Sequence, residues 1–171
     1  MFMDFSMANQ NMFSSYFGFT DNEVDILFEK AKSYISPIFT RDDLRYWYDG
    51  YETVNKTKLY NPRSVICALT NNMISNYWTG SGPSDEILNL LKNNVLEIQK
   101  PVAQMISGES IPCIINEYSV NNTQLNSKDS IFSAMVVFGL LTTDGTNKIK
   151  IPNYEIKQQF ESVLRNQKEL G

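Results

Sequence analysis

The residues of this chain with the clearest catalytic potential are Glu155 and Lys157, which form a Glu-Ile-Lys triplet near its end. A carboxylate two residues before a lysine can help to hold a divalent metal ion while the lysine lies near an attacking water, as in metal-dependent nucleases. Asp85 or Asp144 could supply the first acid of such a site. However, the triplet follows Ile-Pro-Asn and has helical periodicity, which predicts Glu155 on a first helical turn. A nuclease is therefore the less favoured hypothesis.

The composition excludes several other kinds of active site. Histidine is absent and Cys67 and Cys113 are the two cysteines, so Ser-His-Asp and Cys-His triads and histidine or multi-cysteine zinc sites are excluded. No G-x-x-x-x-G-K-[ST] pattern occurs, which excludes a Walker A phosphate loop. The run Gly80-Ser81-Gly82 precedes Asp85 and Glu86, whose charges would repel phosphate. We therefore expect no catalytic residue, cofactor or metal in this chain alone.

Aromatic side chains concentrate around two predicted loops, at Tyr46, Trp47, Tyr48, Tyr51, Tyr60, Tyr77 and Trp78. Such rings can stack on the bases of single-stranded nucleic acids. The 15 basic and 19 acidic residues give a formal net charge of −4, and the lysines are dispersed, so a basic groove is not expected. The rings are therefore interpreted as a packed cluster between helices or as a protein interface, and we do not expect nucleic acid binding.

Capping patterns predict three helices in the first half of the chain. Thr20 with Glu23 forms a capping box before a periodic apolar run that stops at Pro37. Thr40 opens a second, short helix through about Trp47. Asn61 as N-cap and Pro62 as first helical residue open a third, which ends before Tyr77.

The second half of the chain is predicted to end in a winged-helix-like lobe. A buried helix, a β-hairpin and an amphipathic helix in this order favour that arrangement. Lys148 and Lys150 could form a basic wing, but alternating lysines more often protect an edge strand from aggregation. The predicted elements are a helix capped by Ser84, a helix over 101–106, a strand over 111–118, a helix over 130–138, a hairpin over 140–151 with Asp144-Gly145 as its turn, and a last helix with Ile156, Phe160, Val163 and Leu164 inside.

The predicted fold class is mainly α with a small β-hairpin, arranged as a helical lid followed by a winged-helix-like lobe. Residues 19–98 are assigned to the lid and residues 99–171 to the winged-helix-like lobe. Residues 1–18 are rich in Met, Phe, Ser and Asn, and we interpret them as the remnant of a preceding domain or as a disordered leader.

Five motifs follow one another along the chain: Phe17-Gly18-Phe19-Thr20 with Glu23-Val24, Trp47-Tyr48-Asp49-Gly50-Tyr51, Tyr60-Asn61-Pro62 with Ser64, Tyr77-Trp78-Thr79-Gly80, and Ile151-Pro152-Asn153 with Glu155. In this order and spacing they resemble the C-terminal part of the AAA-ATPase-like family, whose members often carry a PD-(D/E)xK-type nuclease domain further downstream. The match covers the chain from Phe17 to Gly171. Arg63 stands where the family commonly has tryptophan, and Ser81 replaces a usual threonine.

The resemblance implies a non-catalytic coupling or interaction module without its own nucleotide site. The family's Walker motifs belong to an N-terminal ATPase core that this sequence lacks, so ATP and Mg²⁺ are implied only for that missing core. The chain would be a truncated copy, a gene-model fragment or a freestanding remnant, and residues 1–18 would come from the core. The implied partner is an ATPase core or another protein; the alternative is a freestanding protein-protein interaction domain.

The resemblance also singles out residues with a structural or interaction role. The segment from Trp47 to Tyr51 and the triplet from Tyr60 to Pro62 are expected to form a rigid aromatic turn. In this turn Asp49 accepts backbone hydrogen bonds and Gly50 supplies a permissive backbone conformation. These residues are Trp47, Tyr48, Asp49, Gly50, Tyr51, Tyr60, Asn61, Pro62, Trp78, Pro152 and Asn153.

The sequence favours an intracellular, cytoplasmic protein. The longest apolar run, Ala134 to Leu141, is too short to span a bilayer and contains Gly139. Residues 1–16 lack the features of a secretory signal, and two cysteines in a chain of 171 residues are typical of a reduced environment. The sequence does not indicate an oligomeric state.

Overall fold

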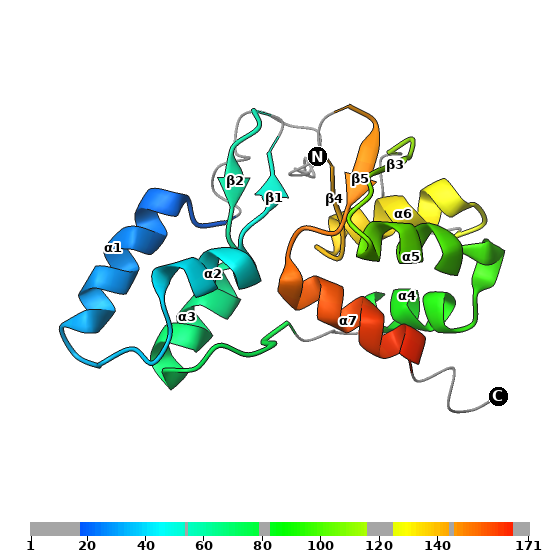
Figure 1. Ribbon diagram of the computed structural model, residues 1–171. Helices are drawn as coiled ribbons and strands as arrows, with labels where there is room; N and C mark the ends of the chain where they lie inside the picture. Colours follow the sequence, from blue (N-terminus) through cyan, green and yellow to red (C-terminus); the bar gives the residue numbers. More distant parts are fainter. Residues whose placement is uncertain (1–17, 54, 79–82, 116–124, 144–145, 166–171) are drawn as a thin grey trace, which may run out of the picture.

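The computed structural model describes residues 18–53, 55–78, 83–115, 125–143 and 146–165. Helices dominate these residues, and the strands form two small antiparallel sheets, which confirms the predicted fold class of mainly α with a small hairpin. The elements fall into a first lobe (residues 18–77) and a second lobe (residues 78–165) that lie side by side (Figure 1). No helix within the described ranges is both long and apolar enough to cross a membrane.

The three predicted helices of the first lobe are confirmed. The capping boxes at Thr20 and Thr40 are both closed, and the Asn61 side chain accepts from the backbone N–H groups of Arg63 and Ser64. The hairpin β1–β2 between the second and third helices was not expected from the sequence. The elements are α1 (Asp21–Lys32), α2 (Arg41–Tyr48), β1 (Tyr51–Glu52), β2 (Lys58–Leu59) and α3 (Pro62–Asn71).

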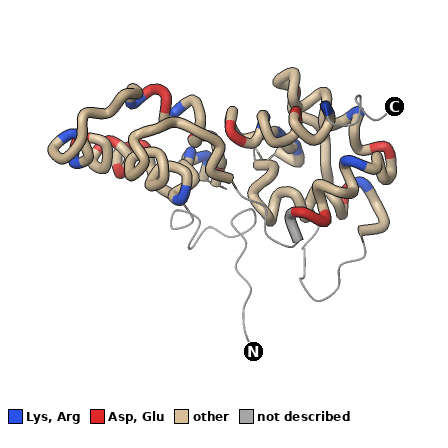
Figure 2. The backbone as a smooth tube through the Cα atoms, turned by 90° about the horizontal axis from the view of Figure 1, so that it is seen from below, with Lys and Arg blue, Asp and Glu red and all other residues tan. Residues whose placement is uncertain are grey.

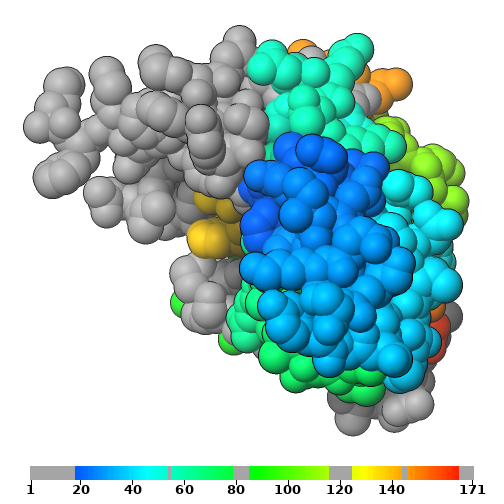
Figure 3. Space-filling view, turned by 90° about the vertical axis from the view of Figure 1, so that its left-hand side faces the viewer, coloured from blue at the N-terminus to red at the C-terminus, as the bar shows by residue number. Residues whose placement is uncertain are grey.

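An apolar core and one charged network hold the first lobe together. The Arg41 guanidinium bonds to Asp21 and Asp25 at 2.7 Å and covers the ring of Tyr60, so it ties α1 to α2. At the outer end of this lobe, α1 and the segment after it form most of the described surface (Figure 3). The buried core residues are Val24, Phe28, Leu44, Tyr48, Tyr60, Val65, Ala68 and Leu69.

The second lobe has its own apolar core, to which every α-helix of the lobe contributes. The nearly all-apolar α6 is buried within it, as predicted. The helix α4, which the sequence analysis assigned to the 19–98 segment, also packs in this core. The elements are α4 (Pro83–Lys92), a short 3₁₀ helix η2 (Val95–Glu97), α5 (Gln99–Ile106), β3 (Ile111–Pro112), α6 (Lys128–Val137), β4 (Thr142–Thr143), β5 (Lys148–Lys150) and α7 (Tyr154–Arg165).

Three details of the second lobe differ from expectation. The helix α4 begins at Pro83, so Ser84 lies inside it rather than capping it. The strand expected over 111–118 is observed as β3 alone, and residues 116–118 lie outside the described ranges, as does the Asp144-Gly145 turn. The strand β5 pairs with β3 and β4 on its two sides, so Lys148 and Lys150 lie on a central strand, not on an edge.

Charged residues of both signs are scattered through both lobes (Figure 2). Several ion pairs join residues three or four apart in one helix, as in Lys32–Glu29, Arg45–Asp42 and Arg165–Glu161. Such exposed pairs contribute little to stability. These pairs each lie within one helix, so they do not join one lobe to the other.

The lobes meet where α2 packs against α7 and β1 lies beside β4 (Figure 1). Gly50 has a φ of +111°, and a Cβ placed on it would come within 2.0 Å of the Pro152 carbonyl oxygen. Only glycine therefore permits this close approach of the two backbones. The Lys150 ammonium, next to the junction, pairs with Glu52 of the first lobe at 2.5 Å.

We expect Gly50→Ala to lower the free energy of unfolding by at least about 2 kcal/mol more than Gly108→Ala, because overpacking adds to the conformational strain. Gly108 is a matched control, since its φ is +100° but nothing lies within 4 Å of the position of its added Cβ. Urea unfolding of the two variants measures the difference. Equal losses would show that the Pro152 contact is unimportant.

Candidate functional site

The most densely bonded buried group at the lobe junction is the carboxylate of Glu155, in the first turn of α7. It is fully buried and accepts the Ser64 hydroxyl from α3 at 2.9 Å. It also accepts the backbone N–H groups of Tyr77 at 2.7 Å and Trp78 at 2.8 Å. The Asn76 amide donates to the Glu155 backbone carbonyl at 2.9 Å. We call Glu155, Ser64, Asn76, Tyr77 and Trp78 the Glu155 junction.

Burial raises the pKa of the Glu155 carboxyl above its ordinary value, because the charged form is removed from water. The hydrogen bonds from Ser64, Tyr77 and Trp78 oppose this shift in the pKa without cancelling it. A buried carboxylate is tolerated only when its oxygens are satisfied in this way. The three donors thus join α3 and the segment 76–78 to α7.

The motif residues of the first lobe lie beside this junction. The Tyr48 hydroxyl donates to the Ser75 carbonyl at 2.7 Å and accepts the Ser75 N–H at 3.1 Å, which fixes the segment that leads to Tyr77. The Tyr48 carbonyl accepts the N–H of Asn61, the cap of α3. The structure thus brings the first aromatic motif into contact with the Tyr-Asn-Pro motif.

Two further motif residues connect the lobes directly. The Tyr51 hydroxyl donates to the Gly139 carbonyl at 2.9 Å, across 88 positions of sequence. Pro152 meets Gly50, and the Asn153 side-chain oxygen caps α7 by accepting the Ile156 N–H at 3.1 Å. The Ile-Pro-Asn motif therefore lies against the first aromatic motif, although about a hundred residues separate them.

Asp49 only partly follows the expectation that its carboxylate accepts backbone donors. The Gly50 N–H lowers the pKa of Asp49, but burial outweighs it and raises the pKa overall. The oxygen Oδ1 is buried and has no hydrogen-bond partner among the described residues, and neither has Nδ2 of Asn153.

The aromatic residues divide between the core and the junction. Tyr48, Tyr51 and Tyr60 are buried, and Tyr48 and Tyr60 belong to the apolar core of the first lobe. Tyr154 of α7 stacks on Tyr46 at 4.9 Å and meets the edge of Trp47 at 4.8 Å, so rings from α2 and α7 add to the contact between the lobes.

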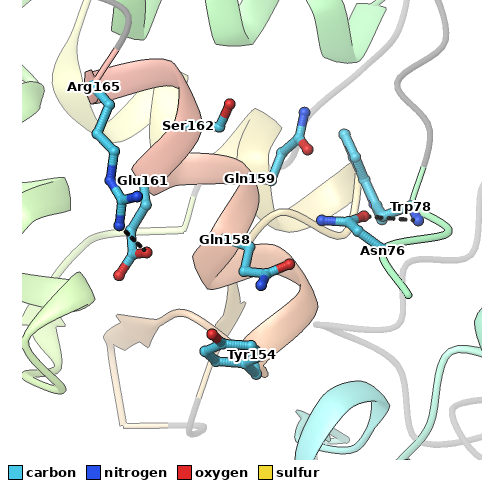
Figure 4. A pocket seen from close by; sticks show the side chains of 8 residues that line it. All are labelled: Asn76, Trp78, Tyr154, Gln158, Gln159, Glu161, Ser162 and Arg165. Atoms are coloured by element: carbon cyan, nitrogen blue, oxygen red, sulfur yellow. Dashed lines mark hydrogen bonds and ion pairs between the residues drawn. The ribbon is translucent and has the colours of Figure 1, made fainter. Parts of the chain in front are cut away.

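A pocket of about 580 Å³ lies beside the Glu155 junction, between α7 and the segment 76–78. In Figure 4, Gln158 and Gln159 extend from α7 toward the side where Asn76 and Trp78 lie. Glu161 and Arg165 also line the pocket, and they form an ion pair at 3.2 Å (Figure 4). The rest of the lining is Tyr154 and Ser162.

The Glu155–Lys157 pair has a geometry that disfavours metal-dependent hydrolysis. The triplet lies at the start of a helix, as predicted, and the carboxylate is already occupied by three donors. Within the described ranges, no group of three or more His, Cys, Asp or Glu residues is placed to hold a metal ion. Asp144 lies outside these ranges.

Sequence reasoning missed the central role of Glu155 and Ser64, although both belong to the quoted motifs. The apolar positions of α7 centre on Ile156 and Phe160, so periodicity places Glu155 at the border of the buried face. Its burial arises from the packing of the first lobe on α7. The one available signal was an acidic residue two positions after the helix cap Asn153.

A scan against models of protein families, a search of curated proteins and a search of solved structures each find no match for this chain. The resemblance to the AAA-ATPase-like family therefore rests on the motifs alone.

We expect Glu155→Ala to lower the free energy of unfolding by at least about 3 kcal/mol, because the Ser64 hydroxyl and two backbone N–H groups lose a buried acceptor. Glu161→Ala is the matched control on the same helix, and its ion pair with the exposed Arg165 predicts a loss below about 1 kcal/mol. Urea unfolding measures both values. Similar losses in the two variants would contradict the role of the junction.

The stability of the protein relative to Glu155→Gln should depend on pH. Because the pKa of Glu155 is raised in the folded state, its contribution is fully present below the ordinary pKa of 4.5 and is lost as the pH rises through the folded pKa. The stability of the natural protein minus that of the variant should therefore fall with rising pH. Urea unfolding from about pH 4 to about pH 8 tests this. A difference that grows with pH would mean that the three hydrogen bonds outweigh burial.

Proposed function

We propose that this chain is the non-catalytic C-terminal portion of an AAA-ATPase-like protein and acts as a coupling module. The observation that carries the proposal is the convergence of separate family motifs on one junction between two lobes. The Trp-Tyr-Asp-Gly-Tyr, Tyr-Asn-Pro, Tyr-Trp and Ile-Pro-Asn motifs all contribute to the Glu155 junction or to its immediate surroundings.

The coupling works through the rigidity of the junction. When α2 or α3 is displaced, α7 must move with it. Otherwise the hydrogen bond from Ser64 to the Glu155 carboxylate and the backbone contact between Gly50 and Pro152 would break. A change imposed on the first lobe, the lid in this proposal, is therefore passed to the second, winged-helix-like lobe. The ATPase core would supply the nucleotide site with ATP and Mg²⁺, and this chain would pass the nucleotide state onward.

The proposed partner is the ATPase core or another protein in the cytoplasm. Tyr34 and Ile38 expose 80% and 78% of their surface at the outer end of the first lobe, where a partner could cover them. The alternative function is a freestanding protein-protein interaction domain, which would use the same surfaces without a core.

The mass of the native protein tests the proposal. An antibody raised against this chain should detect, in the cells that produce it, a band far above 19.6 kDa. Peptide mass analysis of that band should find an upstream glycine-rich loop that ends in Lys-Ser or Lys-Thr. A single band at 19.6 kDa would contradict the ATPase assignment and support the freestanding domain.

A further inference from the structure

The chain enters the first lobe through an isolated antiparallel bridge between Phe19 and Tyr60. The Tyr60 N–H donates to the Phe19 carbonyl at 2.8 Å, and the Phe19 N–H donates to the Tyr60 carbonyl at 3.2 Å. Gly18 lies directly before the bridge, and a Cβ added to it would come within 2.8 Å of both the Leu59 Cβ and the Tyr60 carbonyl oxygen. The entry segment is therefore packed closely against the residues that precede α3.

Tyr60 connects this entry to all three helices of the first lobe. Its hydroxyl donates to Asp21 of α1 at 2.5 Å and accepts from Arg41 of α2 at 3.0 Å. Its ring is buried in the apolar core of the lobe. The residue that follows it, Asn61, is the N-cap of α3. Because close-packed side chains transmit displacements to their neighbours, a shift of Tyr60 must move these elements as well.

Two short routes lead from Tyr60 to the Glu155 junction. In the first, the next residue caps α3, whose Ser64 hydroxyl donates to both carboxylate oxygens at 2.9 Å. In the second, the backbone N–H of the same cap donates to the Tyr48 carbonyl at 3.1 Å, and the Tyr48 hydroxyl donates to the Ser75 carbonyl at 2.7 Å. The segment after Ser75 supplies the two backbone donors of the carboxylate. All three hydrogen bonds to Glu155 thus come from elements that Tyr60 positions.

The bridge has the properties of an element with two states. Two backbone hydrogen bonds outside a longer ladder can open locally while the rest of the fold stays intact. Physical coupling between two sites requires such an element, whose equilibrium both sites bias. In the proposed function residues 1–18 come from the ATPase core, so a movement of the core reaches the rest of the chain first at this bridge.

From these contacts we infer that the Phe19–Tyr60 bridge is a conformational switch that controls the Glu155 junction. While the bridge is closed, Tyr60 keeps the α3 cap and the Tyr48–Ser75 contact in the positions that the junction requires. When a movement of the core opens the bridge, Tyr60 shifts, the donors of Glu155 separate from the carboxylate and the contact between the lobes loosens. The inference rests on the proposed function and names the point at which the state of the core enters the lid.

Hydrogen exchange of the natural full chain, followed by NMR at increasing urea concentrations, tests the inference. Amide protons that open in one cooperative unit share one free energy of opening. We expect the amide protons of Tyr60, Tyr77 and Trp78 to form such a unit, which opens at a lower free energy than the amide protons of α6. A free energy of opening that differs between Tyr60 and the other two, or exchange of all three only together with α6, would overturn the inference.

The variant Gly18→Ala opens the bridge directly, because its added Cβ collides with Leu59 and with the backbone after it. Relative to the amide protons of α6, those of Tyr77 and Trp78 should exchange at least about tenfold faster than in the natural chain. Phe28→Leu is the control, since Phe28 lies in the same apolar core but outside both routes, and it should leave this ratio unchanged. An unchanged ratio in Gly18→Ala would also overturn the inference.

The two measurements protect each other. The experiment on the natural chain needs no variant, so it decides the question even where circular dichroism shows that Gly18→Ala is unfolded. Hydrogen exchange is measured on the purified chain and the native mass in the producing cells, so failure of the switch and failure of the ATPase assignment are separate results.

Discussion

The burial of one carboxylate constrains the whole molecule. Glu155 lies at the start of α7, where the favourable end of the helix dipole and the hydrogen bonds from Ser64, Tyr77 and Trp78 compensate its lost hydration. Ser64 and Tyr77 belong to the first lobe and Trp78 to the second, so the carboxylate has all three donors only when the two lobes are in contact. The cost of burying the carboxylate arises in that same contact, and the three hydrogen bonds offset part of it.

The close backbone contact of Gly50 with Pro152 adds a geometric constraint to this electrostatic one. Hydrogen bonds tolerate small shifts, but an approach that excludes even a Cβ atom fixes the distance between two segments closely. The bond from the Tyr51 hydroxyl to the Gly139 carbonyl acts at the same boundary. The junction is therefore fixed at several separated points, which resists rotation of one lobe on the other as well as separation.

The sequence predicted the elements whose signals are local. The capping boxes at Thr20 and Thr40 and the Asn61-Pro62 start each depend on residues within four positions, and all three helices form where expected. The hairpin β1–β2, the central position of β5 and the burial of Glu155 depend instead on distant partners. The two-residue strands of that hairpin carry no usable period, and the pairing of β5 with β3 joins segments far apart in the chain.

The structure also changes what the family motifs signify for function. In the sequence alone, motifs rich in Trp, Tyr, Asp and Gly suggest a binding site, because such residues are common at exposed recognition surfaces. Here Tyr48 and Tyr60 are fully buried, and Gly50 serves a backbone contact. The motif residues therefore explain why the two lobes form one unit, because they supply the contacts that join α2, β1 and α3 to α7 and to the segment around Gly139.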